Sequence, residues 1–270
     1  MTLKEAEQIL ADNGIEDARH EARIIFAAVG GEPIYKLLSP SYECENEAVA
    51  EAVLRRAKRE PLAYIIGWVD FYNERYKVTP DCLIPRPDTE VLVDFAVDNI
   101  PEGELFLDLC TGSGCVAIST LCNTKNTRCT AVDISEAALT VAKENAAFME
   151  VSDRIDFIRA DVTSAAVRDK VFAVLSNPPY VSESAYRTLE PEIFREPSIA
   201  FLGGEDGGDF YRILTPMYRE VISDEGFIAY EIGYDQADLL KKIAMDNSMR
   251  CSILRDLSGN TRVAVLRKIL

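Results

Sequence analysis

From Leu105 to Ser176 the sequence repeats a strand, a short loop and a helix, and this alternation constrains the fold more than any other feature. The run LFLDL is followed by CTGSG and by the helical pattern CVAISTLC, and CTAVDI, IDFIRA and VFAVLS have the length and composition of strands. Such alternation indicates right-handed βαβ units. The late runs GFIAYEI, CSILRDL and RVAVLRK predict further strands, with an antiparallel edge. We therefore predict an α/β fold with a doubly wound, mostly parallel sheet.

The region before this alternation has a different, helical pattern. Apolar residues share one helix face in the runs that contain Leu3 and Phe26, and residues 48–58 form a third helical run. The stretch 71–84 alternates polar and apolar residues around turn signals, as in a hairpin. We predict a helical domain over residues 1–70, a hairpin linker over 71–86 and the α/β domain over 87–270.

Composition and charge exclude several classes of function. The net charge is -16, from 29 basic and 45 acidic residues, and it is negative on both sides of Pro80. Surfaces that bind nucleic acids normally carry a basic excess, so direct nucleic-acid binding is disfavoured. The seven cysteines form no CxxC pair, and His20 is the only histidine, so we expect no metal site and no histidine base.

The sequence also predicts a cytoplasmic protein. No apolar stretch is long enough to span a bilayer, and the start, MTLKEAEQIL, reads as an acidic amphipathic helix rather than a signal peptide. An odd number of scattered cysteines is typical of reduced thiols.

A glycine-containing loop follows the first strand of the alternation. The strand ends at Asp108, and the loop has Gly112 and Gly114, where glycine lets the backbone approach a ligand. The loop lacks both the GxGxxG spacing and a GKS/T sequence, which disfavours nicotinamide cofactors and nucleoside triphosphates. By itself it is equally compatible with an ordinary turn between a strand and a helix.

The next two strand ends favour an adenosyl ligand. Asp133 ends the second strand, where a doubly wound sheet binds the two hydroxyls of a ribose. Asp161 and Val162 end the third strand and are placed to meet the edge and the face of an adenine. Either aspartate could instead cap the following turn, since Ser135 and Thr163 come soon after.

The fourth strand runs into Asn177-Pro178-Pro179-Tyr180. Two prolines stiffen the chain and remove backbone donors, which leaves carbonyl groups free to accept hydrogen bonds. Asn177 adds a side-chain carbonyl and Tyr180 a flat ring, a set that suits a planar NH2 group. Acceptors that orient the two hydrogens also orient the nitrogen lone pair, so such a site needs no base. The alternative is a rigid turn without a catalytic role.

The chain resembles the HemK/PrmC family, the glutamine methyltransferases that modify peptide chain release factors. The resemblance covers residues 59–270, with a compatible helical region before them. NPPY alone occurs in several families, including DNA adenine methyltransferases, whereas IPRPDTE together with EPSIAFLGGEDG is far more specific. The matching runs are REPLAYIIGWVDFY, IPRPDTEVLVD, LDLCTGSG, AVDISEAAL, SNPPY, EPSIAFLGGEDGGDFYR and DLSGNTRVAVLRK.

The resemblance implies a class I Rossmann-like methyltransferase that methylates the amide nitrogen of the glutamine in the Gly-Gly-Gln motif of release factors. The donor would be S-adenosyl-L-methionine, the product S-adenosyl-L-homocysteine, and no metal would be needed. The helical domain would help to recognise the protein substrate. The implied cofactor residues are Cys110, Thr111, Gly112, Ser113, Gly114, Asp133, Asp161, Val162 and Asn177. The implied substrate residues are Asn177, Pro178, Pro179 and Tyr180, of which Asn177, Pro178 and Tyr180 are the catalytic candidates.

Two positions depart from the family pattern, and two other functions remain open. The family usually has glycine at Cys110 and commonly tryptophan at Val162, which bears on cofactor affinity more than on the type of reaction. A nucleic-acid amino-methyltransferase could use the same NPPY clamp on a flipped adenine or guanine. A non-catalytic binding module could keep the fold without the activity. Charge and linker motif disfavour the former, and the complete NPPY motif and ligand loop disfavour the latter.

Three charged residues in the linker allow two interpretations. Arg86, Asp88 and Glu90 either shape the mouth of a pocket or form ion pairs and cap the helix that begins near Thr89.

Overall fold

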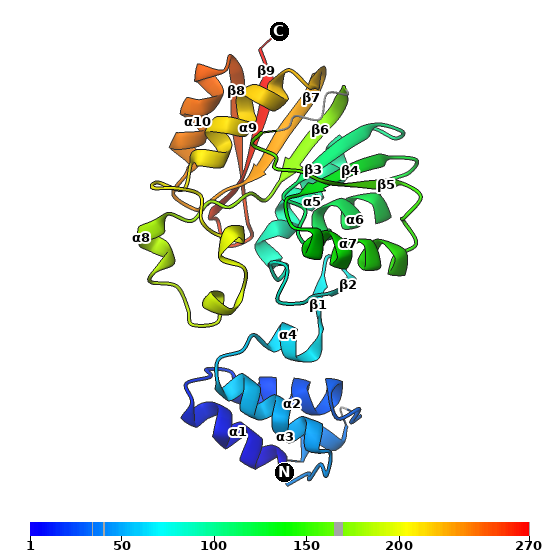
Figure 1. Cartoon of the computed structure of the whole chain (residues 1–270), viewed down its shortest axis with the longest axis vertical. Coiled ribbons are helices and arrows are strands. Elements are labelled where there is room, and N and C mark those ends of the chain that lie inside the picture. Colours follow the sequence, from blue (N-terminus) through cyan, green and yellow to red (C-terminus); the bar gives the residue numbers. More distant parts are fainter. Residues whose placement is uncertain (34, 40, 165–169, 270) are drawn as a thin grey trace. The chain divides into compact units, whose positions relative to one another are not determined.

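A computed structural model describes residues 1–33, 35–39, 41–164 and 170–269 of the 270-residue chain. These residues form two compact units. We call Met1–Trp68 with Glu190–Arg195 the helical unit, and Val69–Leu189 with Glu196–Leu270 the sheet unit. Figure 1 shows the elements of each unit, and the two are described separately below.

The helical unit buries the apolar faces of its helices against one another. The core includes Leu3, Leu10, Ile25, Phe26 and Val53, all of which are fully buried. The helices are α1 (Leu3–Asp12), α2 (Ala18–Ala28), α3 (Glu47–Ala57) and α4 (Leu62–Ile66), with a 3-10 turn at Lys36–Leu38. The N-terminal helical part that the sequence predicts is therefore confirmed.

Arg56 of α3 and Arg59, which follows the end of this helix, bind a segment of the helical unit that is distant in the sequence. Arg56, which is almost completely buried, pairs with Glu21 at 2.5 Å and with Glu192 at 2.7 Å. Arg59 pairs with the other oxygen of Glu192 at 2.8 Å. Segment 190–195 thereby contributes a carboxylate to a buried ion-pair network, in which each charge has a partner, as burial requires.

The sheet unit contains a hairpin, a seven-stranded sheet and helices on both faces. The hairpin strands are β1 (Trp68–Phe71) and β2 (Glu74–Lys77). The strands of the large sheet are β3 (Leu105–Leu109), β4 (Arg128–Asp133), β5 (Ile155–Arg159), β6 (Val171–Ser176), β7 (Ile222–Glu231), β8 (Met249–Arg255) and β9 (Thr261–Lys268). The helices are α5 (Glu90–Asn99), α6 (Cys115–Cys122), α7 (Glu136–Phe148), α8 (Glu183–Tyr186), α9 (Asp209–Arg219) and α10 (Ala237–Asp246).

The sheet has the strand order β5-β4-β3-β6-β7-β9-β8. Pairs from β5 to β7 are parallel, whereas β9 is antiparallel to both β7 and β8. The prediction of a mostly parallel, doubly wound sheet with an antiparallel edge is confirmed. Strand β3 is the first of the parallel strands in the chain but lies in the middle of them. Strands β4 and β5 follow on one side of it and β6 and β7 on the other, so the strand order reverses between β3 and β6. In open α/β sheets this point of reversal is where ligands bind.

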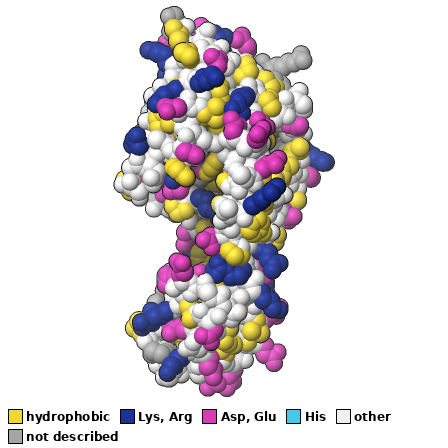
Figure 2. Space-filling model, turned by 90° about the vertical axis from the view of Figure 1, so that its left-hand side faces the viewer, with side chains coloured by type: hydrophobic (Ala, Val, Ile, Leu, Met, Phe, Trp, Pro, Cys, Tyr) yellow, Lys and Arg dark blue, Asp and Glu magenta, His cyan; other side chains and the backbone are white. Residues whose placement is uncertain are grey.

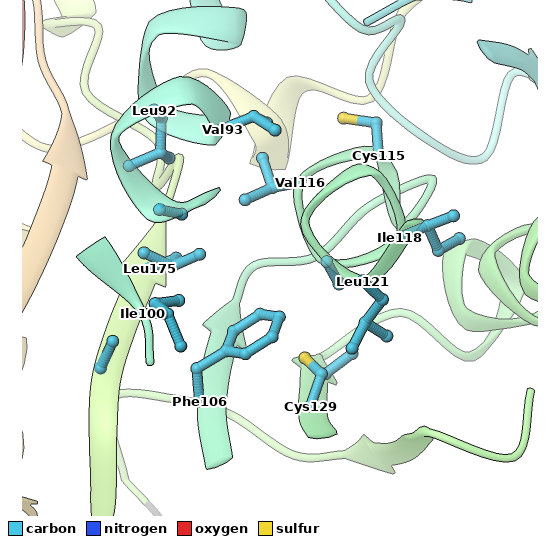
Figure 3. Close-up of a cluster of buried hydrophobic side chains, with 14 of the residues drawn as sticks. Leu92, Val93, Ile100, Phe106, Cys115, Val116, Ile118, Leu121, Cys129 and Leu175 are labelled. Atoms are coloured by element: carbon cyan, nitrogen blue, oxygen red, sulfur yellow. The ribbon is translucent and has the colours of Figure 1, made fainter. Parts of the chain in front are cut away.

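Alternate residues of the strands face two hydrophobic layers. Phe106 and Leu175 face the layer of α5 and α6, and Figure 3 shows them in one cluster with Leu92, Val93 and Val116 of these helices. Leu107, Leu109 and Ile228 are among the residues of the opposite layer, which contains α9 and α10. Both faces of the central strands are therefore buried, which explains why their sequences are mostly apolar.

The hairpin starts earlier than the sequence pattern predicts. The pattern places it over residues 71–84, whereas its strands end at Lys77. The turn consists of Tyr72 and Asn73, with φ of 51° and 66°. Two central residues with positive φ are the mark of a tight type I′ hairpin turn, but Tyr-Asn is not a strong signal for it.

Among the described residues, no helix is long and apolar enough to cross a membrane.

Candidate active site

A cavity of about 250 Å3 opens at the carboxyl ends of the parallel strands. Because β3, β4, β5 and β6 run in the same direction, the residues after each strand meet at this edge. The residues of the predicted site that line the cavity are Cys110, Gly112, Asp133, Asp161, Val162, Asn177 and Pro179. Thr111 and Ser113 line a smaller neighbouring cavity, together with Cys110, Gly112 and Asn177. Gly114, Pro178 and Tyr180 line neither of them.

The loop between β3 and α6 uses three residues with positive φ. Cys110 has φ of 61°, Gly112 of 55° and Gly114 of 83°. A side chain on Gly112 would meet nothing within 4 Å, so the backbone there borders open space. A Cβ on Gly114 would lie 2.8 Å from Ile118 and 3.1 Å from Ala142, so this glycine lets α6 and α7 pack closely. Cys110 adopts the left-handed torsion that its place in the loop requires.

The carboxylate of Asp133 organises the glycine loop. Its Oδ2 accepts the backbone N–H of Gly112 at 2.9 Å, and its Oδ1 accepts that of Ser135 at 2.9 Å. Burial raises the pKa of Asp133, although these backbone hydrogen bonds oppose the rise. Each carboxylate oxygen can accept more than one hydrogen bond, so acceptor capacity remains toward the cavity.

Asp161 and Val162 have different surroundings at the end of β5. Asp161 is exposed, and its Oδ1 accepts hydrogen bonds from the N–H and the hydroxyl of Thr163, at 2.9 and 2.7 Å. These bonds lower the pKa of Asp161 and stabilise the turn. Val162 is buried in the layer of α9 and α10 while it borders the cavity. Asp161 therefore caps the turn at Thr163, which is the alternative role that the sequence left open. It also lines the cavity.

The NPPY motif is fixed by contacts from several parts of the sheet unit. Ser176 donates from Oγ to the carbonyl of Leu109 at 2.7 Å, which joins the ends of β6 and β3. Asn177 is half-buried and donates from Nδ2 to Oγ1 of Thr89 at 3.3 Å. Tyr180 donates from its hydroxyl to Oε1 of Glu231 at 2.9 Å, and its carbonyl accepts from Gln236 at 2.9 Å.

Two glycines of the run GGEDGG let the chain pass directly over this motif. A Cβ on Gly203 would lie 2.5 Å from the carbonyl oxygen of Pro179, and one on Gly207 would lie 2.1 Å from that of Tyr180. Only glycine can occupy such contacts without a shift of the backbone. The run is therefore part of the structure that shapes the NPPY motif.

The charged residues of the linker form pairs within the sheet unit. Arg86 pairs with Glu196, whose other oxygen accepts the N–H of Ile84 at 3.0 Å. Asp88 pairs with Arg262 at 3.0 Å, and Glu90 accepts the N–H of Tyr72 at 2.9 Å. Helix α5 begins at Glu90, after a 3-10 turn at Pro87–Thr89. These contacts support the pairing interpretation, although Arg86 also lines the smaller cavity.

Sequence reasoning missed several residues that line the cavity. They come from the linker, from the segment after the NPPY motif and from the start of α9, and include Asp81, Cys82, Leu83, Ile199, Ala200 and Phe210. Their only signal was membership of the runs VTPDCLIPRP and EPSIAFLGGEDGGDF, which carry no ligand pattern of their own. Burial raises the pKa of Cys82 to about 11 and raises that of Cys110 as well, so both thiols are neutral lining groups.

Figure 2 shows Lys and Arg side chains interspersed with Asp and Glu on the face that it draws. In the part of the chain that the structure describes, no cluster of three or more His, Cys, Asp and Glu side chains could hold a metal ion.

Comparison with known proteins assigns both parts of the chain. Residues 2–67 match the PrmC N-terminal domain, and residues 87–206 match the Methyltransferase small domain. A bifunctional methyltransferase of Rickettsia felis is 36% identical over 306 residues, which cover 99% of this chain and 57% of that protein. The chain thus spans little more than half the length of this relative.

A relative of similar length and a solved structure complete the comparison. The release factor glutamine methyltransferase of Caulobacter vibrioides is 34% identical over 268 residues, which cover 96% of this chain and 93% of that protein. The structure of the ribosomal protein L11 methylase from Lactobacillus delbrueckii subsp. bulgaricus superposes with a TM-score of 0.52 at 19% identity, over 71% of this chain and 84% of that one, and shows the fold alone. The match to the Caulobacter protein over nearly the full length of both chains shows that this chain belongs to the release factor glutamine methyltransferase family.

Proposed function

We propose that this chain transfers a methyl group from S-adenosyl-L-methionine to the side-chain amide nitrogen of a glutamine, that of the Gly-Gly-Gln motif of release factors. One observation carries the proposal beyond family membership. Asn177 lines the cavity at the strand ends, and its NH2 group is already bound to Thr89. Its carbonyl oxygen is therefore available to accept a hydrogen bond from the NH2 group of a substrate amide.

The residues around the cavity fit the proposed cofactor. Asp133 retains acceptor capacity for the hydroxyls of a ribose, and Gly112 offers a backbone without side chain next to open space. Val162, Ala200 and Phe210 give the same cavity an apolar part, which suits a planar base. When bound, S-adenosyl-L-methionine supplies a methyl group on a sulfonium sulfur, which departs as a neutral thioether, and S-adenosyl-L-homocysteine is the product.

The protein's contribution to the reaction would be orientation. An amide nitrogen is a poor nucleophile because its lone pair is delocalised into the carbonyl group. Acceptors from Asn177 and from the carbonyl group of Pro178 would hold both amide hydrogens in a fixed plane, which directs the lone pair to one face. A preorganised set of this kind accelerates a reaction without a side-chain base. One amide hydrogen must be lost as a proton after the new N–C bond has formed.

The helical unit would contribute to recognition of the protein substrate rather than to cofactor binding. Its match to the PrmC N-terminal domain supports this division, as does the position of the cavity wholly within the sheet unit. We expect the enzyme to act in the cytoplasm, because its proposed substrates work on ribosomes. We also expect it to work without a metal, since the sulfonium is itself an activated methyl donor.

A methyl-transfer assay with tritiated S-adenosyl-L-methionine tests the proposal. Purified release factor, duplex DNA and ribosomal RNA are offered separately, and label is measured in each. We expect label in release factor alone, and its loss when the glutamine of the Gly-Gly-Gln motif is replaced by alanine. Label in DNA or RNA would establish the amino-methyltransferase alternative. Cofactor binding without transfer to any of the three would establish a non-catalytic module.

A further inference from the structure

A buried glutamate lies behind the NPPY motif. Glu231 is the last residue of β7 and is 1% exposed. Its Oε1 accepts the hydroxyl hydrogen of Tyr180 at 2.9 Å. Its Oε2 is buried and makes no well-aligned hydrogen bond among the described residues, yet the Thr89 hydroxyl is near enough to lower the pKa of this carboxyl. A buried carboxylate of this kind strongly favours neighbouring hydroxyl groups that donate to it.

The hydroxyl of Thr89 stands between this carboxylate and Asn177. Thr89 is 2% exposed, and its Oγ1 accepts a hydrogen bond from Nδ2 of Asn177 at 3.3 Å. A hydroxyl group has one hydrogen to donate, and accepting a bond from Asn177 leaves that hydrogen free. Glu231 lies close enough to receive that hydrogen, and its buried Oε2 has no other hydrogen-bond partner among the described residues.

This arrangement determines which end of the Asn177 amide faces the cavity. The nitrogen and oxygen of an amide can exchange places, and the surrounding hydrogen bonds decide between the two orientations. If Oδ1 faced Thr89, the threonine hydrogen would turn toward Asn177 and away from Glu231. A buried carboxylate would then lose a donor, which typically costs about 1–3 kcal/mol. The orientation with Oδ1 toward the cavity is therefore favoured.

We propose that Glu231 and Thr89 are the positioning residues of the methyl-transfer site. Glu231 holds the Tyr180 hydroxyl directly, and through Thr89 it keeps the carbonyl oxygen of Asn177 turned toward the substrate amide. One buried carboxylate thus fixes both polar members of the NPPY motif. This inference rests on the proposed function, since it assigns these residues a part in the orientation of the glutamine.

The charges around Glu231 are consistent with its role as an acceptor. Burial raises its pKa, and the charge of Asp88 raises it further, whereas the hydroxyls of Thr89 and Tyr180 and the charge of Arg262 lower it. Arg262 is itself held by Asp88 at 3.0 Å and by Asp256 at 3.2 Å. A cation fixed beside the carboxylate favours its ionised form, which accepts hydrogen bonds and donates none.

Replacement of Thr89 tests the inference in the full-length protein. Thr89→Val removes the hydroxyl and Thr89→Ser keeps it. Thr120→Val is the control, because Thr120 is a fully buried threonine whose hydroxyl has no hydrogen-bond partner within the described part of the chain. We expect kcat for release factor methylation to fall about 10- to 100-fold in Thr89→Val, the scale for loss of a group that orients a functional side chain. KM and the Kd for S-adenosyl-L-homocysteine should change less than about threefold, and Thr89→Ser should restore most of kcat. Thr120→Val should leave all of these unchanged.

A double-mutant cycle separates positioning from a general structural effect. In an Asn177→Ala background, Thr89→Val should reduce kcat little further, because the side chain that it positions is absent. Glu231→Gln provides a second variant, and it too should lower kcat more than cofactor affinity. A normal kcat in Thr89→Val, or an equal fold-loss in both backgrounds, overturns the inference while the proposed function stands. If the wild-type protein fails to methylate release factor, the proposed function is wrong and the inference falls with it.

Discussion

The backbone N–H of Gly112 donates to Oδ2 of Asp133 at 2.9 Å, so the glycine loop after β3 is tied to the end of β4. This bond joins two features that the sequence shows separately, a loop free of bulky side chains and a carboxylate at a strand end. It gives Asp133 a part in shaping the backbone that borders the cavity, beside the part in cofactor binding that we propose for it.

Asp133→Ala should weaken cofactor binding about tenfold to a hundredfold. The ribose would lose a charged acceptor, whose removal costs about 1.5–3 kcal/mol, and the loop would lose the bond that holds Gly112. Calorimetry with S-adenosyl-L-homocysteine measures the change. Asp156→Ala is the control, since Asp156 lies in the neighbouring strand β5 and is exposed. Equal affinity in both variants would remove Asp133 from the site.

Gly112→Ala should reduce cofactor affinity, and the loss should exceed what the accompanying loss of folding stability can explain. An alanine at positive φ should cost about 1–2 kcal/mol of folding free energy, at Gly112 and at the control position alike. Gly103→Ala is the matched control, because Gly103 also has positive φ and also has nothing within 4 Å of its Cβ position, but lies in an exposed turn. We expect similar unfolding free energies for the two variants, and loss of binding in Gly112→Ala alone. Full affinity in Gly112→Ala would show that no ligand approaches this backbone.

Gly203→Ala should lower turnover more than it lowers cofactor affinity. The new methyl group would press on the carbonyl of Pro179, and so displace the clamp without touching the ribose side of the cavity. Gly226→Ala introduces a contact that is at least as tight, 2.2 Å from the carbonyl oxygen of Phe172, at the opposite end of β6. It should destabilise the fold and leave kcat per folded molecule unchanged. Parallel losses of kcat in the two variants would argue against a specific effect on the clamp.

The strand ends could be predicted from the sequence because their signals are local. Asp133 and Asn177 follow apolar runs of strand length, and parallel strands bring such residues to one edge whatever the remaining structure. Cys110, where the family usually has glycine, adopts the left-handed torsion of this loop with φ of 61°.

The surroundings of the clamp could not be predicted in the same way. Thr89 and Glu231 contact the NPPY motif from positions about 90 residues before and 50 residues after it, and nothing in their local sequence indicates this. Ile199 and Phe210 come from irregular and helix-start positions without a periodic pattern. Helix α9 also contains Pro216, a residue that disfavours helix interiors, so tertiary packing outweighs local preference there.

Asp108→Asn should stabilise the protein relative to wild type as pH rises. Burial raises the pKa of Asp108 to about 7, and the carboxyl is 1% exposed. In the unfolded chain its pKa is near the usual value of about 4. Between about pH 4 and pH 7 the folded state therefore binds more protons than the unfolded state. Stability consequently falls as pH rises through this range. Urea unfolding from pH 4 to pH 8 should show Asp108→Asn gaining about 1 kcal/mol or more over wild type, since each pKa unit corresponds to about 1.4 kcal/mol. A difference that is independent of pH would contradict a raised pKa.

The central claim is that Asn177 orients a substrate amide, and turnover of Asn177→Ala tests it most directly. The side chain is small, and among the described residues it makes one hydrogen bond, to Thr89. Its loss should therefore change the stability of the fold little and leave the Kd for S-adenosyl-L-homocysteine within about threefold of wild type. Single-turnover transfer of tritiated methyl to purified release factor should fall about a hundredfold or more, the scale for loss of one preorganised polar group. A variant that binds cofactor normally and methylates release factor at a near-normal rate would show that Asn177 is a turn residue and would contradict the mechanism.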